Sequence, residues 1–263
     1  MCATCGCSSD HDHDHDHDRD HAHTHGPAPG HGVRVPHVHV HPPVRTLTLE
    51  KDVLSRNDLR AARNRGWLEG REILALNVMS SPGAGKTTLL ERTIGRLRGE
   101  LAISVVEGDQ ATLRDAERIQ AAGAAAFQIN TGAGCHLDAD MLAEGLRRLA
   151  PPPRSLLIIE NVGNLVCPAL FDLGERVRVV VVSVTEGEDK PLKYPHMFRA
   201  GNVLVLNKID LLPHVSFELD RFLEYAHRIN PGLRVFQLSA TRGDGLEPWC
   251  DWLRDELTRC AHA

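Results

Sequence analysis

The sequence has few aromatic residues, no long apolar run and no block of basic residues. Aromatic side chains make up 4% of its 263 residues and the formal net charge is −5, so it offers neither a platform for stacking bases nor a basic surface for nucleic acid. No apolar run approaches the roughly 18 to 20 residues that cross a bilayer, and the start lacks the segments of a signal peptide. We therefore expect a cytoplasmic protein that binds neither nucleic acid nor a membrane. In that compartment its seven cysteines are expected to be thiols or metal ligands rather than disulfides.

The first 43 residues differ sharply in composition from the rest. Eleven of the sixteen histidines lie before residue 42, and histidine alternates with aspartate from His11 to Asp18. Apolar residues are almost absent before Val33, and proline and glycine recur, so this segment cannot bury a core and is predicted to be disordered. Imidazole binds nickel, zinc, copper and cobalt. A metal-binding tail is therefore favoured, and a solvated low-complexity tail is the alternative.

Three cysteines stand at the start of this tail. Cys2, Cys5 and Cys7, called here the N-terminal cysteine cluster, could supply four ligands together with the α-amine. A planar arrangement of thiolates and amine favours Ni(II), whereas a tetrahedral arrangement favours zinc. A reactive, disordered terminus is the alternative. We predict a metal site at these cysteines.

An apolar run at 73–79 leads into a glycine-rich loop and then into a helical pattern. This order of strand, loop and helix is what a phosphate-binding loop requires, although Ser80 stands where the pattern GxxxxGK[ST] has its first glycine. Lys86 is expected to reach the β- and γ-phosphates and Thr87 to hold Mg²⁺. The loop residues expected to bind the nucleotide are Gly83, Ala84, Gly85, Lys86, Thr87 and Thr88.

Two acidic residues at strand ends are expected to lie near the phosphates. Asp109 ends one apolar run, and we expect it to contact Mg²⁺ or its water, because carboxyl ends of parallel strands face the ligand; capping of the next helix is the alternative. Glu160 begins a DxxG-like sequence with glutamate in place of aspartate, and the Gly163 N–H is placed to sense the γ-phosphate, making 160–168 a candidate switch loop. Asn164 replaces a water-positioning glutamine, so slow intrinsic hydrolysis is expected. The candidate catalytic residues are Lys86, Thr87, Asp109 and Glu160.

The sequence Asn207-Lys208-Ile209-Asp210 follows an apolar run and predicts a guanine pocket. The Asp210 carboxylate can accept from both N1–H and the 2-amino group of guanine, a pattern that adenine does not offer. Lys208 is expected to lie along the base and Asn207 to tie this pocket to the phosphate loop. Ser239 and Ala240, after a further strand, are expected to close over the guanine carbonyl. The predicted ligands are therefore GTP and GDP rather than ATP.

A second metal site is predicted in the domain. Cys135 and His136 are adjacent on a glycine-rich loop, and Cys167 lies inside the candidate switch loop. These three residues, called here the Cys–His–Cys cluster, can converge on one ion within a subunit or across a dimer, and γ-phosphate binding would then move one ligand. A pair of small buried thiols is the alternative for the cysteines. Cys250 and Cys260, near two tryptophans of the last helix, are expected to be packing residues or surface thiols.

At these residues the chain resembles the HypB family, P-loop GTPases of the SIMIBI class that take part in nickel insertion into [NiFe]-hydrogenase. The resemblance covers almost the whole chain. The motifs that carry it are the N-terminal cysteine cluster, the His-rich segment, 80–87, 107–109, 134–136, 160–168, 186–195 and 207–210.

The resemblance implies a homodimer promoted by GTP, with the Cys–His–Cys cluster at the subunit interface binding nickel or zinc. It also implies a high-affinity nickel site at the N-terminal cysteine cluster and a position near the nucleotide for Lys190. Expected partners are a zinc-containing hydrogenase accessory protein of the HypA type, a nickel-binding chaperone and, indirectly, the hydrogenase large subunit. Expected ligands are GTP or GDP, Mg²⁺ and Ni²⁺, with Zn²⁺ as the alternative to nickel.

We expect residues 44–263 to form one α/β domain of the P-loop NTPase type, preceded by the disordered tail 1–43. The sheet should be mostly parallel, with about seven strands and helices on both faces. The pattern from Val44 to Gly70 predicts a helix for which Asn57 and Asp58 offer a cap.

The expected function is Mg²⁺-dependent GTP hydrolysis that gates nickel delivery into [NiFe]-hydrogenase, with nickel storage on the tail as an added role. The rivals are the related urease nickel GTPase, which keeps its metal site as a contiguous Cys-Pro-His, a nickel storage protein, and a chaperone for cobalamin enzymes.

Overall fold

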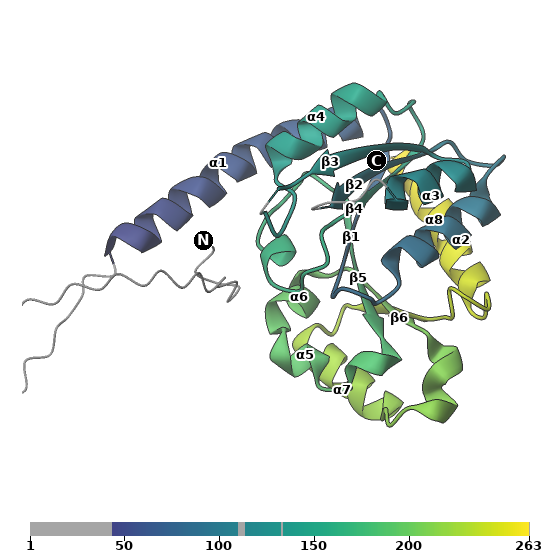
Figure 1. Ribbon diagram of the computed structural model, residues 1–263. Helices are drawn as coiled ribbons and strands as arrows, with labels where there is room; N and C mark the ends of the chain where they lie inside the picture. The colour runs from purple at the N-terminus through teal and green to yellow at the C-terminus, as the bar shows by residue number, and fades with distance from the viewer. Residues whose placement is uncertain (1–43, 110–113, 133, 263) are drawn as a thin grey trace, which may run out of the picture. The chain divides into compact units, whose positions relative to one another are not determined.

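The computed structural model describes the backbone of residues 44–109, 114–132 and 134–262, and the side chains of these residues from Asp52 onward except at Asp109 and Arg114 (Figure 1). The chain divides into two units, Met1–Lys51 and Asp52–Ala263. The predicted disordered tail and its N-terminal cysteine cluster lie outside the described residues.

The second unit is built on one sheet of seven strands, all parallel, in the order β3-β2-β4-β1-β5-β6-β7. The predicted fold class is therefore confirmed. The strands are β1 Leu74–Ser80, β2 Ile103–Asp109, β3 Ala125–Asn130, β4 Leu156–Glu160, β5 Val177–Ser183, β6 Val203–Asn207 and β7 Arg234–Gln237.

Helices connect successive strands, as parallel pairing requires. The α-helices are α1 Val44–Glu69, α2 Lys86–Leu97, α3 Arg114–Ala122, α4 Ala139–Leu149, α5 Lys190–Lys193, α6 Pro195–Ala200, α7 Leu219–Ile229 and α8 Leu246–Cys260. Three short 3-10 helices are η1 Cys167–Ala169, η2 Val184–Glu186 and η3 Ile209–His214. Among the described residues no helix is long and apolar enough to cross a bilayer.

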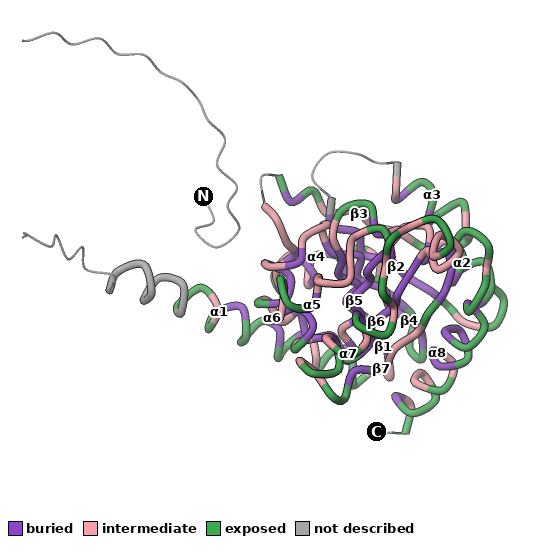
Figure 2. The backbone as a smooth tube through the Cα atoms, turned by 90° about the horizontal axis from the view of Figure 1, so that it is seen from below, coloured by how far each residue is buried: buried purple, intermediate pink, exposed green. Residues whose placement is uncertain are grey.

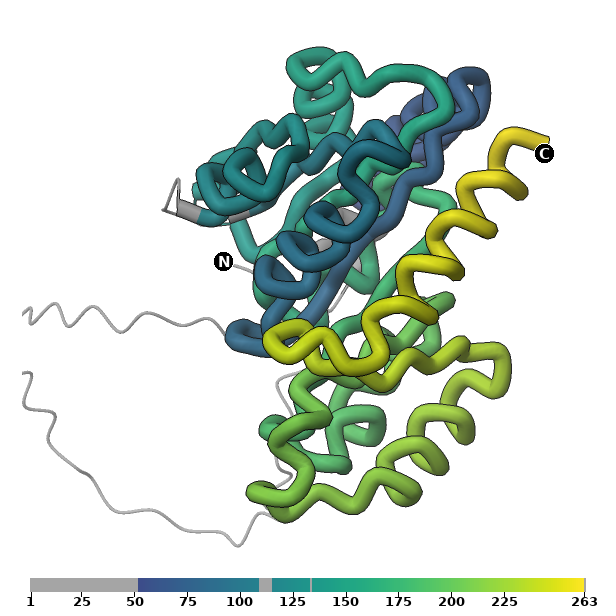
Figure 3. Tube along the Cα trace, turned by 90° about the vertical axis from the view of Figure 1, so that its right-hand side faces the viewer, coloured from purple at the N-terminus to yellow at the C-terminus, as the bar shows by residue number. Residues whose placement is uncertain are grey.

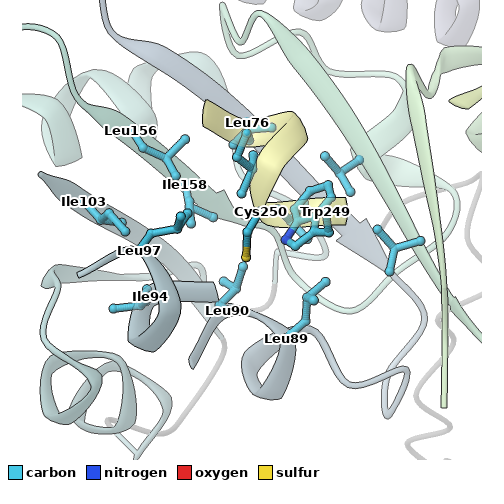
Figure 4. Close-up of a cluster of buried hydrophobic side chains, with 14 of the residues drawn as sticks. Leu76, Leu89, Leu90, Ile94, Leu97, Ile103, Leu156, Ile158, Trp249 and Cys250 are labelled. Atoms are coloured by element: carbon cyan, nitrogen blue, oxygen red, sulfur yellow. The ribbon is translucent and has the colours of Figure 1, made fainter. Parts of the chain in front are cut away.

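The strands are almost continuously apolar because helices cover both faces of the sheet. Side chains alternate along each strand, so Leu74 and Leu76 face one layer and Ala75 faces the other. The first layer holds α2, α3 and α8, where Leu90, Ile94 and Trp249 pack on the sheet (Figure 4), and α8 lies beside α2 (Figure 3). The second layer holds the end of α1 with α4, and α6 with α7. The five inner strands are consequently buried over almost their whole described length (Figure 2), whereas the edge strands β3 and β7 hold no buried residue.

The two cysteines of α8 belong to the core, as predicted. Cys250 and Cys260 are both buried, and burial raises the pKa of the Cys250 thiol to about 11 and also raises that of Cys260. Both side chains are therefore protonated packing residues at neutral pH, not candidate metal ligands.

The predicted helix cap at Asn57 is wrong. The helix α1 runs from Val44 to Glu69, so Asn57 lies in its interior. Its side chain instead accepts from Ala139 N (2.9 Å), the first residue of α4, and donates to Asp172 O (2.7 Å). Asn64, two turns on, bonds Ala139 O and Leu173 O. The side chain of Asn57 thus forms hydrogen bonds to residues distant in the chain and does not cap the start of a helix.

A glycine against α1 gives a test of this packing. Gly174 has φ +91°, and a Cβ there would lie 2.5 Å from Ala61 O and 2.7 Å from Arg65 N. We expect Gly174→Ala to lower the free energy of unfolding by about 2 kcal/mol or more, through left-handed strain and a backbone clash. Gly95→Ala, in an open position on α2, should raise it by about 0.5–1 kcal/mol. Urea unfolding measures both. If the two substitutions change the free energy of unfolding equally, α1 does not pack on this loop as described.

Candidate functional site

A pocket of about 540 Å³ opens at the carboxyl ends of β1, β2 and β4. It lies where parallel strands deliver their loops and where α2 begins, so backbone N–H groups and the helix dipole favour an anion there. The residues that line it are Pro82, Gly83, Ala84, Gly85, Lys86, Thr87, Thr88, Glu107, Gly108, Asp115, Arg118, Glu160, Asn161, Val162, Gly163 and Lys208. The structure therefore brings the predicted phosphate loop and the candidate switch loop together.

The phosphate loop places the amine of Lys86 over its own turn. Lys86 Nζ donates to Ser80 Oγ (2.9 Å), and the Ser80 hydroxyl donates to Ser81 O (2.6 Å). Ser80 is fully buried at the end of β1. The residue that departs from the usual loop pattern thus positions the lysine, which is a role that glycine could not fill.

Thr87 and Glu160 meet at the floor of the pocket. Thr87 Oγ1 donates to Glu160 Oε1 (2.8 Å), while Glu160 Oε2 is buried with no hydrogen-bond partner among the described residues. Burial raises the pKa of Glu160, an effect that nearby Lys86 opposes. A hydroxyl and a buried carboxylate are hard oxygen ligands of the kind Mg²⁺ prefers, so the residues present fit that ion. Asp109 is the last residue of β2; its side chain is not among those described, and its role stays a prediction.

The predicted base pocket is assembled around the Asn207 side chain. Asn207 Nδ2 donates to Ala84 O (2.9 Å), and its Oδ1 accepts from Lys208 N (2.8 Å) and Ala240 N (3.0 Å). Lys208 Nζ donates to Gly83 O (2.7 Å), and the buried Ser239 precedes Ala240. The predicted tie between base pocket and phosphate loop is present in the structure.

Asp210 lies in η3, directly after this junction, and is half-buried. It is not among the residues lining the phosphate pocket, and its role in binding the base stays a prediction.

The switch loop touches the phosphate loop at Gly163. A Cβ at this position would lie 3.2 Å from the Cα and N atoms of Pro82, so a side chain here would require Pro82 to shift by a few tenths of an ångström. Asn164 behaves differently: its Oδ1 accepts from Val166 N (2.7 Å), and it closes a local turn instead of lining the pocket.

The structure gathers the Cys–His–Cys cluster within one chain. The ligand atoms of Cys135, His136 and Cys167 all lie within 4.8 Å of one another, and the two sulfurs are 2.9 Å apart. The His136 ring stacks on Phe171, with centroids 3.8 Å apart. Burial lowers the pKa of His136, which Asp138 opposes, so the imidazole is neutral at pH 7 and keeps a lone pair for a metal. Two thiols and an imidazole suit nickel or zinc.

One buried side chain connects the two sites. Asn161, which follows Glu160, accepts from Leu137 N (3.1 Å) and Val162 N (3.0 Å) and donates to Asn77 Oδ1 (3.2 Å). Leu137 is the residue after His136, and it packs so closely on Gly108 that a Cβ there would lie 2.6 Å from Leu137 Cγ. The phosphate pocket and the Cys–His–Cys cluster therefore share a wall.

Several pocket residues were not predicted from the sequence. Asp115 and Arg118 enter from α3, and their spacing of three residues resembles any helical ion pair. Glu186 binds the Ser81 hydroxyl and pairs with Lys190 (3.3 Å). Lys190, expected near the nucleotide, thus reaches the phosphate loop through Glu186. The 186–195 motif was the available signal for this contact.

Comparison with known proteins gives a consistent family. The model described as "CobW/HypB/UreG, nucleotide-binding domain" matches residues 74–237. The chain is 52% identical over 217 residues to hydrogenase maturation factor HypB of Escherichia coli (strain K12), covering 82% of this chain and 74% of that protein. It is 56% identical over 217 residues to the same-named factor of Rhizobium leguminosarum bv. viciae, covering 82% and 73%.

Two solved structures share the fold. Hydrogenase maturation factor HypB from Archaeoglobus fulgidus has a TM-score of 0.73 at 42% identity, covering 78% of this chain and 100% of that one. HypB from Helicobacter pylori, in complex with nickel, has a TM-score of 0.72 at 37% identity, covering 78% and 96%.

Glu160 provides the test of the magnesium site. Glu160→Gln keeps an acceptor for Thr87 but removes the anionic oxygen, so the Mg²⁺ concentration that half-maximally strengthens GDP binding should rise by about 10- to 100-fold. GDP affinity in EDTA should be unaffected. Calorimetric titration measures both, with Glu144→Gln on α4 as the control. An unchanged Mg²⁺ dependence would remove Glu160 from the site.

Proposed function

Because the chain belongs to the HypB family within the CobW/HypB/UreG group, we propose that it is a hydrogenase maturation factor. In this proposal it hydrolyses GTP with Mg²⁺, binds nickel, and uses its nucleotide state to deliver nickel into [NiFe]-hydrogenase. The observation that carries the proposal is the wall shared by the phosphate pocket and the Cys–His–Cys cluster, formed by Asn161 and Leu137.

The nucleotide half of the proposal assigns each loop a task. The backbone of Gly83–Gly85 and the start of α2 hold the phosphates, and Lys86, positioned by Ser80, neutralises charge on them. Thr87 and Glu160 hold Mg²⁺, which supplies further positive charge to the phosphates when bound. Asp210, Lys208 and the Ser239–Ala240 loop select guanine.

The metal half treats nickel as cargo. Within one chain the cluster offers two cysteine sulfurs and one neutral imidazole, a donor set that suits Ni²⁺, with Zn²⁺ as the competing occupant. Three ligands leave room in the coordination sphere, so an ion can enter and leave more readily than from a closed four-ligand site.

The partner and storage roles extend the same proposal. A GTP-promoted homodimer would place the two clusters of a pair at one interface, and a zinc-containing HypA-type protein and a nickel-binding chaperone are the proposed partners. The His-rich segment and its cysteine cluster would hold nickel before transfer. The resemblance supports these roles, and the residues concerned in the tail lie outside the described part of the chain.

Guanine selection is tested by inverting one hydrogen-bond pattern. Asp210→Asn replaces an acceptor by a donor, so we expect GTP affinity to fall by about 10²-fold, because buried polar groups are left mismatched. Xanthosine triphosphate, with a carbonyl in place of the 2-amino group, should bind the variant more tightly than GTP does. Competition binding measures the preference, with Asp220→Asn on α7 as the control. Unchanged GTP affinity would remove Asp210 from base recognition.

Coupling of nickel to nucleotide is tested on chains lacking residues 1–41, so that only the domain site is measured. Ni²⁺ affinity should differ by about 5- to 150-fold between the GDP and GTP-analogue forms. The Cys135→Ala/Cys167→Ala variant should bind no Ni²⁺ in any state. Equilibrium titration with Ni²⁺ gives affinity and stoichiometry. If affinity ignores the nucleotide, the coupling mechanism is wrong while the family membership stands.

A further inference from the structure

A guanidinium, that of Arg118, lines the phosphate pocket. Of the pocket-lining side chains in the described residues, three are cationic, namely Lys86, Arg118 and Lys208. Lys86 belongs to the phosphate loop, and Lys208 is engaged by Gly83 O beside the base pocket. Arg118 comes from α3 and has no part in the loop motifs. It is thus a cation at the phosphates that the function proposed above leaves without a task.

Arg118 is held by carboxylates rather than buried in a fixed position. Its Nε and Nη2 bond the two oxygens of Glu91 at 2.9 and 2.7 Å, its Nη1 bonds Asp115 at 3.0 Å, and Nη2 lies 3.5 Å from Thr88 Oγ1. Its side chain is 44% exposed. Ion pairs this exposed contribute little to stability, so the guanidinium can exchange a carboxylate for another anion at small cost.

The neighbours of Arg118 place its side chain beside the candidate magnesium ligands. Thr88 follows the candidate magnesium ligand Thr87 on the first turn of α2, and Arg118 reaches its hydroxyl. Arg118 and Asp115 line the same pocket as Glu160, the carboxylate at its floor. A triphosphate in this pocket therefore lies within the field of Arg118. Charge-assisted bonds from arginine to phosphate are stronger than its exposed pairs with carboxylates.

We propose that Arg118 is a catalytic residue: when a nucleoside triphosphate binds, its guanidinium leaves Glu91 and binds the polyphosphate, where it neutralises charge developing on the leaving GDP. This inference rests on the proposed GTPase function. In the reaction a water oxygen bonds to the γ-phosphorus while the bond from that phosphorus to the β–γ bridging oxygen breaks. The bridging oxygen keeps the electron pair on GDP, and a proton of the water passes to phosphate or solvent. Arg118 donates hydrogen bonds and exchanges no proton.

The inference predicts opposite changes in the rate of GTP hydrolysis when the two partners of one ion pair are substituted. Arg118→Ala should lower the single-turnover rate of GTP hydrolysis by at least about 10²-fold, and Arg118→Lys should restore part of it, since lysine supplies charge without the planar fork. Glu91→Gln, which releases the guanidinium, should raise the rate. Arg96→Ala removes another exposed ion pair of α2, with Glu247 on α8, and should leave the rate unchanged. Phosphate release from the full-length chain with Mg²⁺ measures all four.

Binding and stability separate this role from a structural tie between α2 and α3. The preference of Arg118→Ala for a non-hydrolysable GTP analogue over GDP should fall, with an unchanged melting temperature. If Arg118→Ala and Glu91→Gln both slow hydrolysis and lower the melting temperature alike, Arg118 only joins the helices and the inference is wrong. It is also wrong if Arg118→Ala hydrolyses GTP as the wild type does. If the wild type does not bind GTP, the proposed function fails instead.

Discussion

The amide of Asn207 holds together the three loops from which the nucleotide site is built. It donates to the phosphate loop at Ala84 and accepts from the backbone of Lys208 and Ala240, so its hydrogen-bonding atoms serve three segments that are far apart in sequence. The geometry tolerates no side chain at Gly85, where φ is +95° and a Cβ would lie 2.6 Å from Asn207 Nδ2. Because the amide is buried, losing one of these bonds would leave a polar group unsatisfied away from water. The predicted base pocket and the phosphate loop are therefore held in one arrangement.

Asn161 has the corresponding position on the other side of the phosphate loop. It lies in a chain of buried amides and a carboxylate, from Leu137 N through Asn161 and Asn77 to Glu175, which Arg178 neutralises (2.6 Å). A fully satisfied buried network fixes one arrangement of its members. Asn161 directly follows Glu160, so a change in position of Glu160 acts on Asn161, and thereby on the backbone beside His136. The proposed coupling of nucleotide to metal needs only this short path, with no large domain movement.

Sequence reasoning identified most of the site because its motifs sit at strand ends, where a parallel sheet brings separate segments to one edge. The phosphate loop, Glu160, Asn207 and the Cys–His–Cys cluster could be placed in this way. Strand order could not, since three of the neighbouring pairs, β2–β4, β4–β1 and β1–β5, join strands that do not follow one another in the chain. The cap at Asn57 was misjudged because a local pattern cannot reveal that its amide forms hydrogen bonds with Ala139 N and Asp172 O, which are distant in the chain. Arg118 was not predicted for a related reason: its position in the pocket depends on how α3 packs against α2.

The same packing bears on the slow GTP hydrolysis that the sequence predicts. Arg118 is paired with Glu91 and Asp115, and these exposed ion pairs contribute little to stability. In this position the charge of the guanidinium is neutralised by carboxylates and not by phosphate. The Cys–His–Cys cluster is arranged on a similar principle, because its three candidate ligands would hold an ion without closing its coordination sphere. In both places the structure keeps a reactive group partly satisfied, so that a small gain in interaction energy from nucleotide, metal or partner is sufficient to move it. The proposed release of nickel on a nucleotide signal requires such partly satisfied sites. A site that satisfied every bonding group of the nickel ion or of the guanidinium would bind it too tightly for release.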